Sequence, residues 1–181
     1  MRAAVLVVLV ALIAVLGAAC SATTHDSAVP SLGVGVQVFP VAERSPAPSL
    51  RGTTITGASF DLADATGHGL VAVNVWASWC GPCRREMPVL VQAAGKSLRV
   101  VGIDERDSAG SARTFATSRG ARYPSLADPQ GKLLGRLRML PQTGVPSTVF
   151  LDREGRVAAR VIGPVDSHVL GRILRQLGAS S

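Results

Sequence analysis

The sequence predicts an α/β fold with a central mixed β-sheet flanked by helices. From residue 51 onward, apolar runs of strand length alternate with segments of helix length, which is the pattern of an α/β domain. The run 70–76 is apolar except for Asn74, as expected for a strand buried on both faces. Two further apolar runs flank the turn 153–155 and predict a C-terminal β-hairpin, which a last helix follows.

The helix after the first long strand begins with Gly81-Pro82. Proline suits the first turn of a helix, because its missing N–H would have no partner there. The helix is expected to run to about residue 94, where Gly95 ends it. The other predicted elements are a strand over 98–104, a helix over 108–119 capped by Ser108, a helical stretch over 131–139, strands over 146–152 and 156–162, and a last helix to residue 177 capped by Asp166 or Ser167.

The N-terminus carries an export signal, which we assign to residues 1–19. The chain is apolar from residue 3 to residue 19, slightly short for a membrane-spanning helix, and this run ends in small residues just before Cys20. The ending resembles the lipobox of bacterial lipoproteins, with Gly17 where that family usually has Leu. The resemblance implies lipidation of Cys20 and a domain anchored to the outer face of the bacterial cytoplasmic membrane. An uncleaved anchor and ordinary secretion are the alternatives, and all three place the domain outside the cytoplasm.

The rest of the chain divides into a tether and one domain. Residues 20–48 are rich in Ser, Thr, Ala and Pro and show no sustained hydrophobic period, so we expect a flexible tether. The apolar patch 34–39 within it is not assigned as a strand. Residues 49–181 are expected to form a single domain, because a chain of 181 residues with 47% hydrophobic residues suits one core and is short for two.

The composition argues against binding of nucleic acids. The net charge of +7 comes from 19 basic and 12 acidic residues, but the basic residues are scattered singly or in pairs. Aromatic residues make up 4% of the chain, which leaves little material for a surface that stacks on bases. The positive charge is therefore interpreted as a contribution to solubility, and no nucleic-acid partner is expected.

The cysteines point to thiol chemistry. The chain has three cysteines, and acylation of Cys20 leaves only the Cys-X-X-Cys pair Cys80 and Cys83, so no structural disulfide framework is available. Half of a zinc site has the same spacing, but a second cysteine pair is missing and the three histidines are dispersed along the chain. Binding of Cu(I) by the two thiolates stays open as an alternative, since soft ligands favour that ion.

The segment 76–83, Trp-Ala-Ser-Trp-Cys-Gly-Pro-Cys, resembles the thioredoxin superfamily and its TlpA/ResA/DsbE-like membrane-anchored branch. The likeness covers roughly residues 51–178 and implies a thioredoxin fold with a redox-active disulfide between Cys80 and Cys83. Cys80 precedes the helix N-terminus, where unpaired N–H groups and the helix dipole favour a thiolate, so it is the expected nucleophile. Cys83, one turn further on, would resolve the mixed disulfide.

Glu86 is the candidate proton shuttle. It follows Cys83 by three residues, so its carboxylate can share a helix face with that thiol, and the resemblance implies an acid at this position. An ordinary surface glutamate is the alternative. Thioredoxin itself has a buried Asp six residues before its first cysteine, where this chain has Asn74, and an amide cannot carry a proton at neutral pH. The difference favours the anchored branch and places more weight on Glu86.

The loop 143–148, Thr-Gly-Val-Pro-Ser-Thr, resembles the cis-proline loop of the same family. The resemblance implies a cis bond before Pro146 and places Val145 against the cysteines, where its backbone would pair with an extended substrate segment. Trp79 is expected beside Cys80 as an exposed apolar surface for substrate. Together Trp79, Val145 and Pro146 form the predicted substrate-binding set.

We therefore expect an extracytoplasmic thiol-disulfide oxidoreductase that reduces disulfides of exported proteins, with apocytochrome c as one client that the family suggests. Gly-Pro between the cysteines also occurs in thioredoxin, whose potential is near −270 mV, and this favours reduction. The chain has no nucleotide or flavin motif, so no cofactor is expected and a membrane electron-donor protein is implied. The alternatives are an oxidase that forms disulfides in exported proteins and a non-enzymatic Cu(I)-binding lipoprotein; a peroxidase is less favoured.

Overall fold

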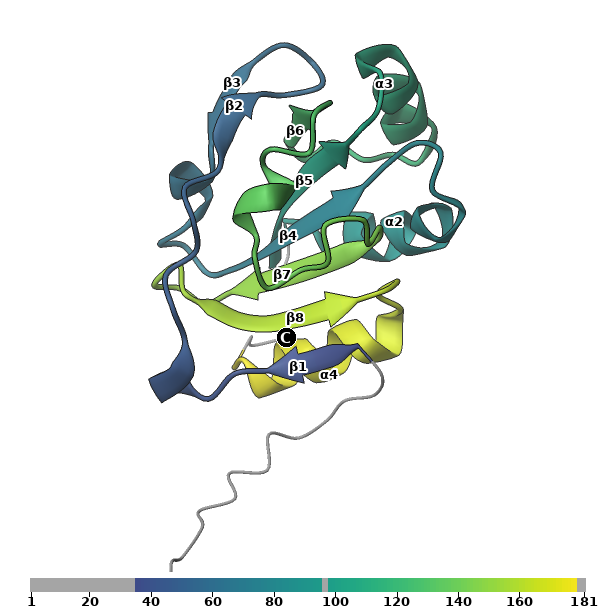
Figure 1. Ribbon diagram of the computed structural model, residues 1–181. Helices are drawn as coiled ribbons and strands as arrows, with labels where there is room; N and C mark the ends of the chain where they lie inside the picture. Colours follow the sequence, from purple (N-terminus) through teal and green to yellow (C-terminus); the bar gives the residue numbers. More distant parts are fainter. Residues whose placement is uncertain (1–34, 96–97, 179–181) are drawn as a thin grey trace, which may run out of the picture.

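A mixed six-stranded sheet forms the centre of the fold in the computed structural model, which describes residues 35–95 and 98–178 (Figure 1). The strand order is β1-β8-β7-β4-β5-β6, and β4, β5 and β6 pair in parallel whereas the other neighbours are antiparallel. The predicted mixed sheet is therefore confirmed. The strands are β1 Val36–Val38, β4 Leu70–Trp76, β5 Leu98–Glu105, β6 Ser125–Asp128, β7 Ser147–Leu151 and β8 Val157–Ile162, with a separate hairpin of β2 Arg51–Thr53 and β3 Ser59–Asp61.

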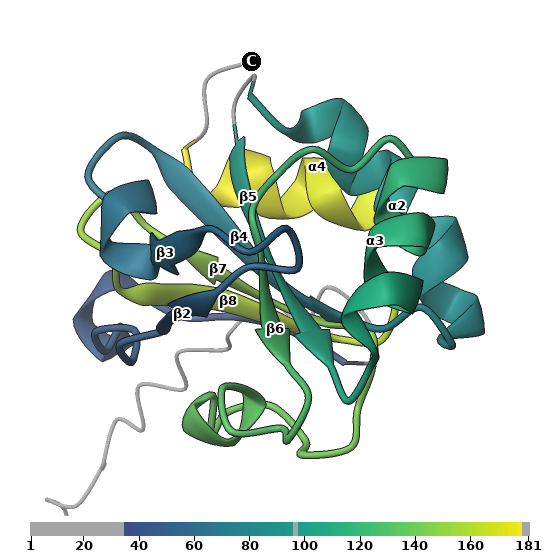
Figure 2. The same cartoon turned by 90° about the horizontal axis from the view of Figure 1, so that it is seen from above.

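The three α-helices cover one face of the sheet and group together (Figure 2). On this face Leu90 of α2 and Ile173 of α4 lie in one apolar cluster with Phe150 of β7. The opposite face is covered by short 3-10 turns and connections, which contribute Leu62 and Leu134. The helices are α2 Gly81–Ala93, α3 Ala109–Ser118 and α4 Ser167–Gln176, and the 3-10 turns are η1 Val41–Glu43, η2 Leu62–Ala65 and η3 Leu134–Arg136. Within the described ranges, no helix is both long and apolar enough to cross a membrane.

Local signals in the sequence explain the helix boundaries. Helix α2 ends at Ala93, and Gly95 follows with φ 80°, a left-handed conformation that glycine adopts at low cost. Ser108 caps α3 by accepting the N–H of Ser111 at 3.1 Å, and Asp166 caps α4 by accepting that of Val169 at 2.7 Å. These three helix predictions are confirmed to within about two residues.

The predicted helical stretch over 131–139 is wrong, since only the 3-10 turn η3 forms there. The backbone N–H groups of Leu133 and Leu134 both donate to the Asp128 carboxylate at 2.9 Å, which fixes the start of the turn. Leu134, Leu137 and Leu140 then enter the core at a spacing of three residues. That spacing matches the 3.0-residue period of a 3-10 helix better than the 3.6-residue period of an α-helix.

The predicted tether over 20–48 is wrong for its last part. Residues 1–34, with the predicted signal peptide and Cys20, lie outside the described residues, but Val36–Val38 form β1 against β8, and Phe39 N–H donates to Ala158 O at 2.8 Å. The domain therefore begins well before residue 49. The apolar patch is too short to predict a strand by itself, and β8 supplies the partner that it needs.

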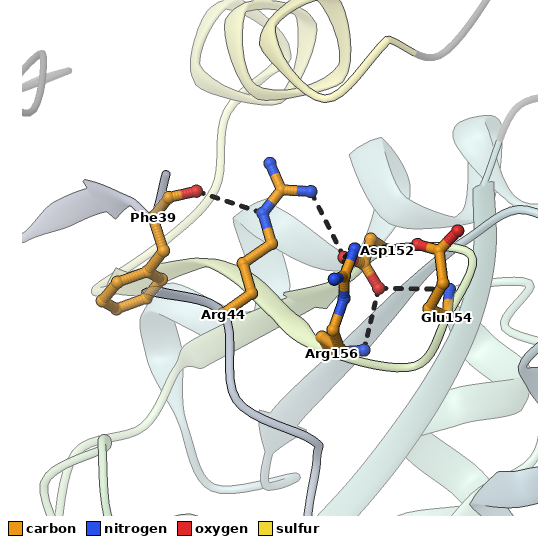
Figure 3. Close-up of polar contacts among 5 residues, drawn as sticks. All are labelled: Phe39, Arg44, Asp152, Glu154 and Arg156. Carbon is orange, nitrogen blue, oxygen red and sulfur yellow. Dashed lines mark hydrogen bonds and ion pairs between the residues drawn. The ribbon is translucent and has the colours of Figure 1, made fainter. Parts of the chain in front are cut away.

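Arg44 links the segment after β1 to the turn between β7 and β8 by hydrogen bonds (Figure 3). Its guanidinium donates to Phe39 O at 3.1 Å and to the Asp152 carboxylate at 3.3 Å. Asp152 also accepts the backbone N–H and the guanidinium of Arg156, at 2.8 and 2.9 Å. Burial acts to raise the pKa of Asp152, but these hydrogen bonds from Arg156 and Arg44 outweigh it and hold the pKa below its usual value.

We expect Asp152→Ala to lower the free energy of unfolding at pH 7 by about 2–3 kcal/mol, because it leaves the half-buried Arg44 side chain without its anion. The pKa of Asp152 is lowered in the folded state, so its contribution is complete above the unfolded value of about 3.9 and is lost as the pH falls through the folded pKa. Urea unfolding at pH 7 and pH 3 measures both. Glu154→Ala, at an exposed position of the same turn, should change little; an equal loss there would contradict this account.

Candidate active site

Cys80 and Cys83 form a disulfide between the end of β4 and the first turn of α2. The sulfur atoms are 2.02 Å apart and the Cα atoms 5.3 Å apart. The exposed fraction is 3% for Cys80 and 1% for Cys83, and both lie in an apolar cluster with Trp76 and Met87. In this oxidised state the small accessible part of the pair is therefore mainly at Cys80, the predicted nucleophile.

The N-terminus of α2 is directed at the Cys80 sulfur. Cys80 is the N-cap residue, and the backbone N–H of Cys83 donates to its Sγ at 3.1 Å. The helix dipole favours negative charge at this place, which stabilises a Cys80 thiolate after reduction. The Arg84 guanidinium donates to Ser78 O at 3.1 Å and lies 5.3 Å from the centre of the Phe115 ring. These contacts hold the guanidinium against Ser78 and Phe115.

Glu86 lies on the buried face of α2, with an exposed fraction of 2%, so it is not a surface residue. Its carboxylate accepts the Asn74 amide at 2.5 Å and the backbone N–H of Val165 at 2.6 Å. Desolvation raises the pKa of Glu86 to about 7, although the hydrogen bonds from Val165 and Asn74 act to lower it. A carboxyl group with this pKa exchanges its proton near neutral pH, as a shuttle requires.

Asn74 and Val165 donate the two hydrogen bonds to the Glu86 carboxylate, and the sequence did not predict either contact. Asn74 donates from the same amide nitrogen to Thr148 Oγ1 at 3.0 Å, so it links β4, β7 and α2. Its signal was visible, because it is the one polar residue in the apolar run of β4. Val165 contributes only its backbone N–H, which no side-chain pattern reveals.

The loop before β7 lies against the cysteines. The Val145–Pro146 peptide bond is cis, as the resemblance implied, and Val145 packs against the cluster that contains Cys80 and Cys83. Pro146 is buried, whereas Val145 is half-buried. Trp79, the residue directly before Cys80, has 56% of its surface exposed. Of the three predicted substrate-binding residues, Trp79 and Val145 thus have accessible surface.

A buried acid at the end of β5 escaped the sequence analysis. Asp104 has an exposed fraction of 1% and pairs with Trp76 in the sheet register. Desolvation, together with the charge and hydrogen bond of Asp107, raises the pKa of Asp104 to about 8. Asp107 in turn accepts the backbone N–H of Ser78 at 2.7 Å, next to the segment that carries Cys80. No motif marks Asp104, since its neighbours come together only in the fold.

We expect Asp104→Asn to raise the melting temperature at pH 8 by about 5–10 °C and to change it less at pH 5. The folded pKa of Asp104 lies above the unfolded value, so stability falls as the pH rises between about 4 and 8, and an amide carries no such cost. Thermal unfolding at the two pH values tests this. Asp64→Asn, at an exposed position, is the control. A gain that is equal at both pH values would contradict the titration of Asp104.

Metal binding has no further support in the described ranges, where no cluster of three or more His, Cys, Asp or Glu side chains is placed to hold an ion. The geometry combines a disulfide, a helix N-terminus and a buried acid whose pKa is raised to about 7.

Comparison with known proteins gives the family. The model of the AhpC/TSA family matches residues 44–160, which include both cysteines and the cis-proline loop. The chain belongs to the AhpC/TSA family. One similar protein is the thiol:disulfide interchange protein DsbE homolog of Paracoccus denitrificans, which is 36% identical. The match covers 66% of this chain and 65% of that protein. The thiol-disulfide oxidoreductase ResA of Bacillus thuringiensis is 26% identical over 72% of this chain and 76% of its own.

A solved structure also relates this AhpC/TSA chain to thiol-disulfide proteins. The secreted thiol-disulfide isomerase from Corynebacterium glutamicum is 28% identical, with a TM-score of 0.72 over 81% of this chain and 93% of that one. The fold is thioredoxin-like, and the predicted ResA/DsbE-like branch is confirmed. This AhpC/TSA protein is a thiol-disulfide oxidoreductase, and its partners are proteins that carry disulfides.

Proposed function

We propose that this oxidoreductase works outside the cytoplasm as a reductase of disulfides in exported proteins, anchored by a lipid on Cys20. The environment of the Cys80 sulfur carries this proposal. The hydrogen bond seen to Cys80 Sγ comes from one backbone N–H. Glu86 follows Cys83 by three residues on α2, so the charge of its carboxyl above pH 7 opposes a second negative charge at the pair. Strong oxidants such as DsbA stabilise their reduced form, and weaker stabilisation of the thiolate favours a lower potential.

The reaction needs two electrons and two protons per substrate disulfide. In the reduced enzyme the Cys80 thiolate attacks one sulfur of the substrate, which forms a mixed disulfide and releases a substrate thiolate that takes up a proton. Cys83 loses its proton to Glu86 and attacks Cys80 Sγ, which releases the second substrate thiol and restores the Cys80–Cys83 disulfide. A dithiol protein in the membrane then returns the two electrons by the same exchange in reverse.

The substrate docks between Trp79 and Val145. Trp79 offers an exposed apolar ring next to Cys80 in the chain, and Val145 offers backbone and apolar surface against the cluster that contains both cysteines. An extended segment that pairs with the backbone at Val145 gains affinity mainly from main-chain hydrogen bonds, so many exported proteins can be clients. Apocytochrome c is one proposed client, because its haem-attachment motif Cys-X-X-Cys-His supplies a disulfide in a short extended segment.

The place of action rests on the N-terminal sequence. The apolar run to residue 19 and the small residues before Cys20 support export and acylation. The related isomerase from Corynebacterium glutamicum is described as secreted, which supports a location outside the cytoplasm for this chain. Labelling of growing cells with a radioactive fatty acid, with a Cys20→Ser variant as control, tests the anchor: loss of label in the variant supports it, and an unlabelled natural chain contradicts it.

The reduction potential of the Cys80–Cys83 pair tests the direction. The chain from residue 20 with Cys20→Ser keeps β1, which completes the sheet, and can be equilibrated with dithiothreitol or glutathione buffers. A potential near or below about −270 mV supports the reductase. A potential above about −200 mV overturns it and makes the protein an oxidase or isomerase. Reduction of an oxidised Cys-X-X-Cys-His peptide, compared with insulin, tests the proposed client.

A further inference from the structure

Arg106 occupies an unusual backbone position beside the active site. Its φ is 49°, and among the described residues it is the one non-glycine residue with positive φ. Such a conformation is sterically disfavoured for a side chain with a Cβ, and glycine or asparagine commonly fills it. Residues held this way cluster at functional sites, because surrounding contacts must compensate for the strain. The contacts of Arg106 therefore indicate what its side chain contributes.

The backbone of Arg106 holds the segment before Cys80. Its carbonyl accepts the indole N–H of Trp79 at 3.3 Å, and its own N–H donates to Asp128 O at 3.0 Å, next to the end of β6. The chain turn at Arg106 also brings the following Asp107 carboxylate to the backbone N–H of Ser78, at 2.7 Å. Two consecutive residues after β5 thus fix the ring and the backbone of the segment 78–79.

The guanidinium of Arg106 reaches the other side of the site. Nη1 lies 2.5 Å from the buried Glu105 carboxylate and donates to Gln142 O at 3.4 Å, three residues before Val145. The group lies over Gly131, where an added Cβ would come within 3.0 Å of Nη2. Gly131 therefore leaves room for the guanidinium, and Glu105 supplies the charge that holds it in this direction.

We propose that Arg106 is a positioning residue that ties Trp79 to the loop of Val145 and so sets the spacing of the surface on which the substrate disulfide docks. One residue contacts both sides of the site: its carbonyl bonds Trp79, and its guanidinium bonds the loop before β7. Glycine would satisfy the backbone without strain, but it has no side chain to reach Gln142. The proposal rests on the proposed docking of substrate between Trp79 and Val145.

A set of variants separates positioning from folding. Arg106→Gly keeps the backbone conformation and removes the guanidinium that contacts Gln142. Arg106→Lys keeps the charge next to Glu105 but replaces the planar guanidinium with an ammonium group. In the double variant Glu105→Gln with Arg106→Gly, no buried carboxylate is left without its cation. Arg138→Ala, at an exposed position outside the site, is the control for loss of one positive charge.

The measurements are kcat and KM for insulin with dithiothreitol as reductant, the rate at which dithiothreitol alone reduces the enzyme disulfide, and the reduction potential. We expect KM to rise about five- to tenfold in Arg106→Gly and in the double variant, and less in Arg106→Lys, because a wrongly placed docking surface weakens binding of a large substrate. The rate with the small dithiol and kcat should stay within about twofold, the potential should be unchanged, and Arg138→Ala should match the natural chain.

Two results would overturn the role of Arg106. The first is an unchanged KM in the double variant, and the second is a joint change of KM, dithiothreitol rate and potential, which would place its effect on the cysteines or the fold. The variant Trp79→Ala distinguishes failure of the proposed role of Arg106 from failure of the proposed docking surface. If it raises KM and the Arg106 variants do not, only the role of Arg106 fails. If neither changes KM, the docking surface fails and the role of Arg106 with it. An oxidising potential would reverse the proposed direction and leave the KM test intact.

Discussion

Replacement of Cys80 with serine is expected to abolish disulfide exchange, with turnover of insulin disulfides falling at least about a thousandfold. A serine hydroxyl stays protonated at neutral pH and cannot form a disulfide, whereas the Cys80 sulfur lies at a helix N-terminus and accepts the N–H of Cys83 at 3.1 Å. Turnover of insulin with dithiothreitol as reductant measures the loss. The fold should persist, since the exchanged atom is small and the apolar cluster around it stays intact.

The matched variant is Cys83→Ser, which should also lose turnover but keep the first step. Its Cys80 thiolate still attacks a disulfide, and no second thiol releases the product, so a stable mixed disulfide accumulates. Mass spectrometry after incubation with insulin or glutathione disulfide detects this adduct. If Cys80→Ser forms the adduct and Cys83→Ser does not, the order of attack is the reverse of the one that their exposed fractions of 3% and 1% indicate.

The parts of the fold that the sequence predicted well carry their signals in short segments. β4 is a continuous apolar run, α2 begins at Gly81-Pro82, and the hairpin of β7 and β8 surrounds a turn with Gly155 at φ 73°. In each case the residues that determine the element lie inside it or next to it. Periodicity and turn chemistry were therefore sufficient.

The errors fall where distant partners determine the structure. β1 exists because β8 offers it an edge, and Arg44 then holds its connection to Asp152, more than a hundred positions along the chain. The region 131–139 forms one 3-10 turn because Asp128 caps it from outside the predicted helix. Neither contact leaves a trace in local composition, so a prediction from one sequence assigned a tether to the first and a helix to the second.

The same distinction applies to the site. The motif gave Cys80, Cys83 and the cis bond before Pro146. Helical spacing placed Glu86 on the face of α2 next to Cys83. Its burial and its two hydrogen-bond donors, Asn74 of β4 and the backbone of Val165 after β8, come from other parts of the chain. Asp104 and Arg106 gain their environment from chain turns and neighbouring strands, and no spacing rule identifies either one.

Glu86→Gln is expected to slow reduction of insulin at pH 8 about tenfold and to remove the rise in rate between pH 6 and 8. The Glu86 carboxyl has a pKa of about 7, so above that value it can take the proton of Cys83, and an amide cannot. Stopped-flow kinetics from pH 5 to 9 test this, with Glu43→Gln as an exposed control in η1. An unchanged pH profile would remove the shuttle from the mechanism.

A structural role for Glu86 would give a different result, and the reduction potential separates the two. The amide keeps the volume of Glu86 but loses one of the bonds to Asn74 and Val165, because it has one acceptor oxygen where the carboxylate has two. That loss is the same at every pH. Removal of the charge acts only above pH 7, where the ionised Glu86 carboxylate destabilises the thiolate of the reduced enzyme. Without that charge the reduced form is more stable, so the reduction potential should rise by about 20–30 mV at pH 8 and stay unchanged at pH 5.5. A shift of equal size at both pH values would mean that Glu86 supports the fold of the site and does not exchange its proton.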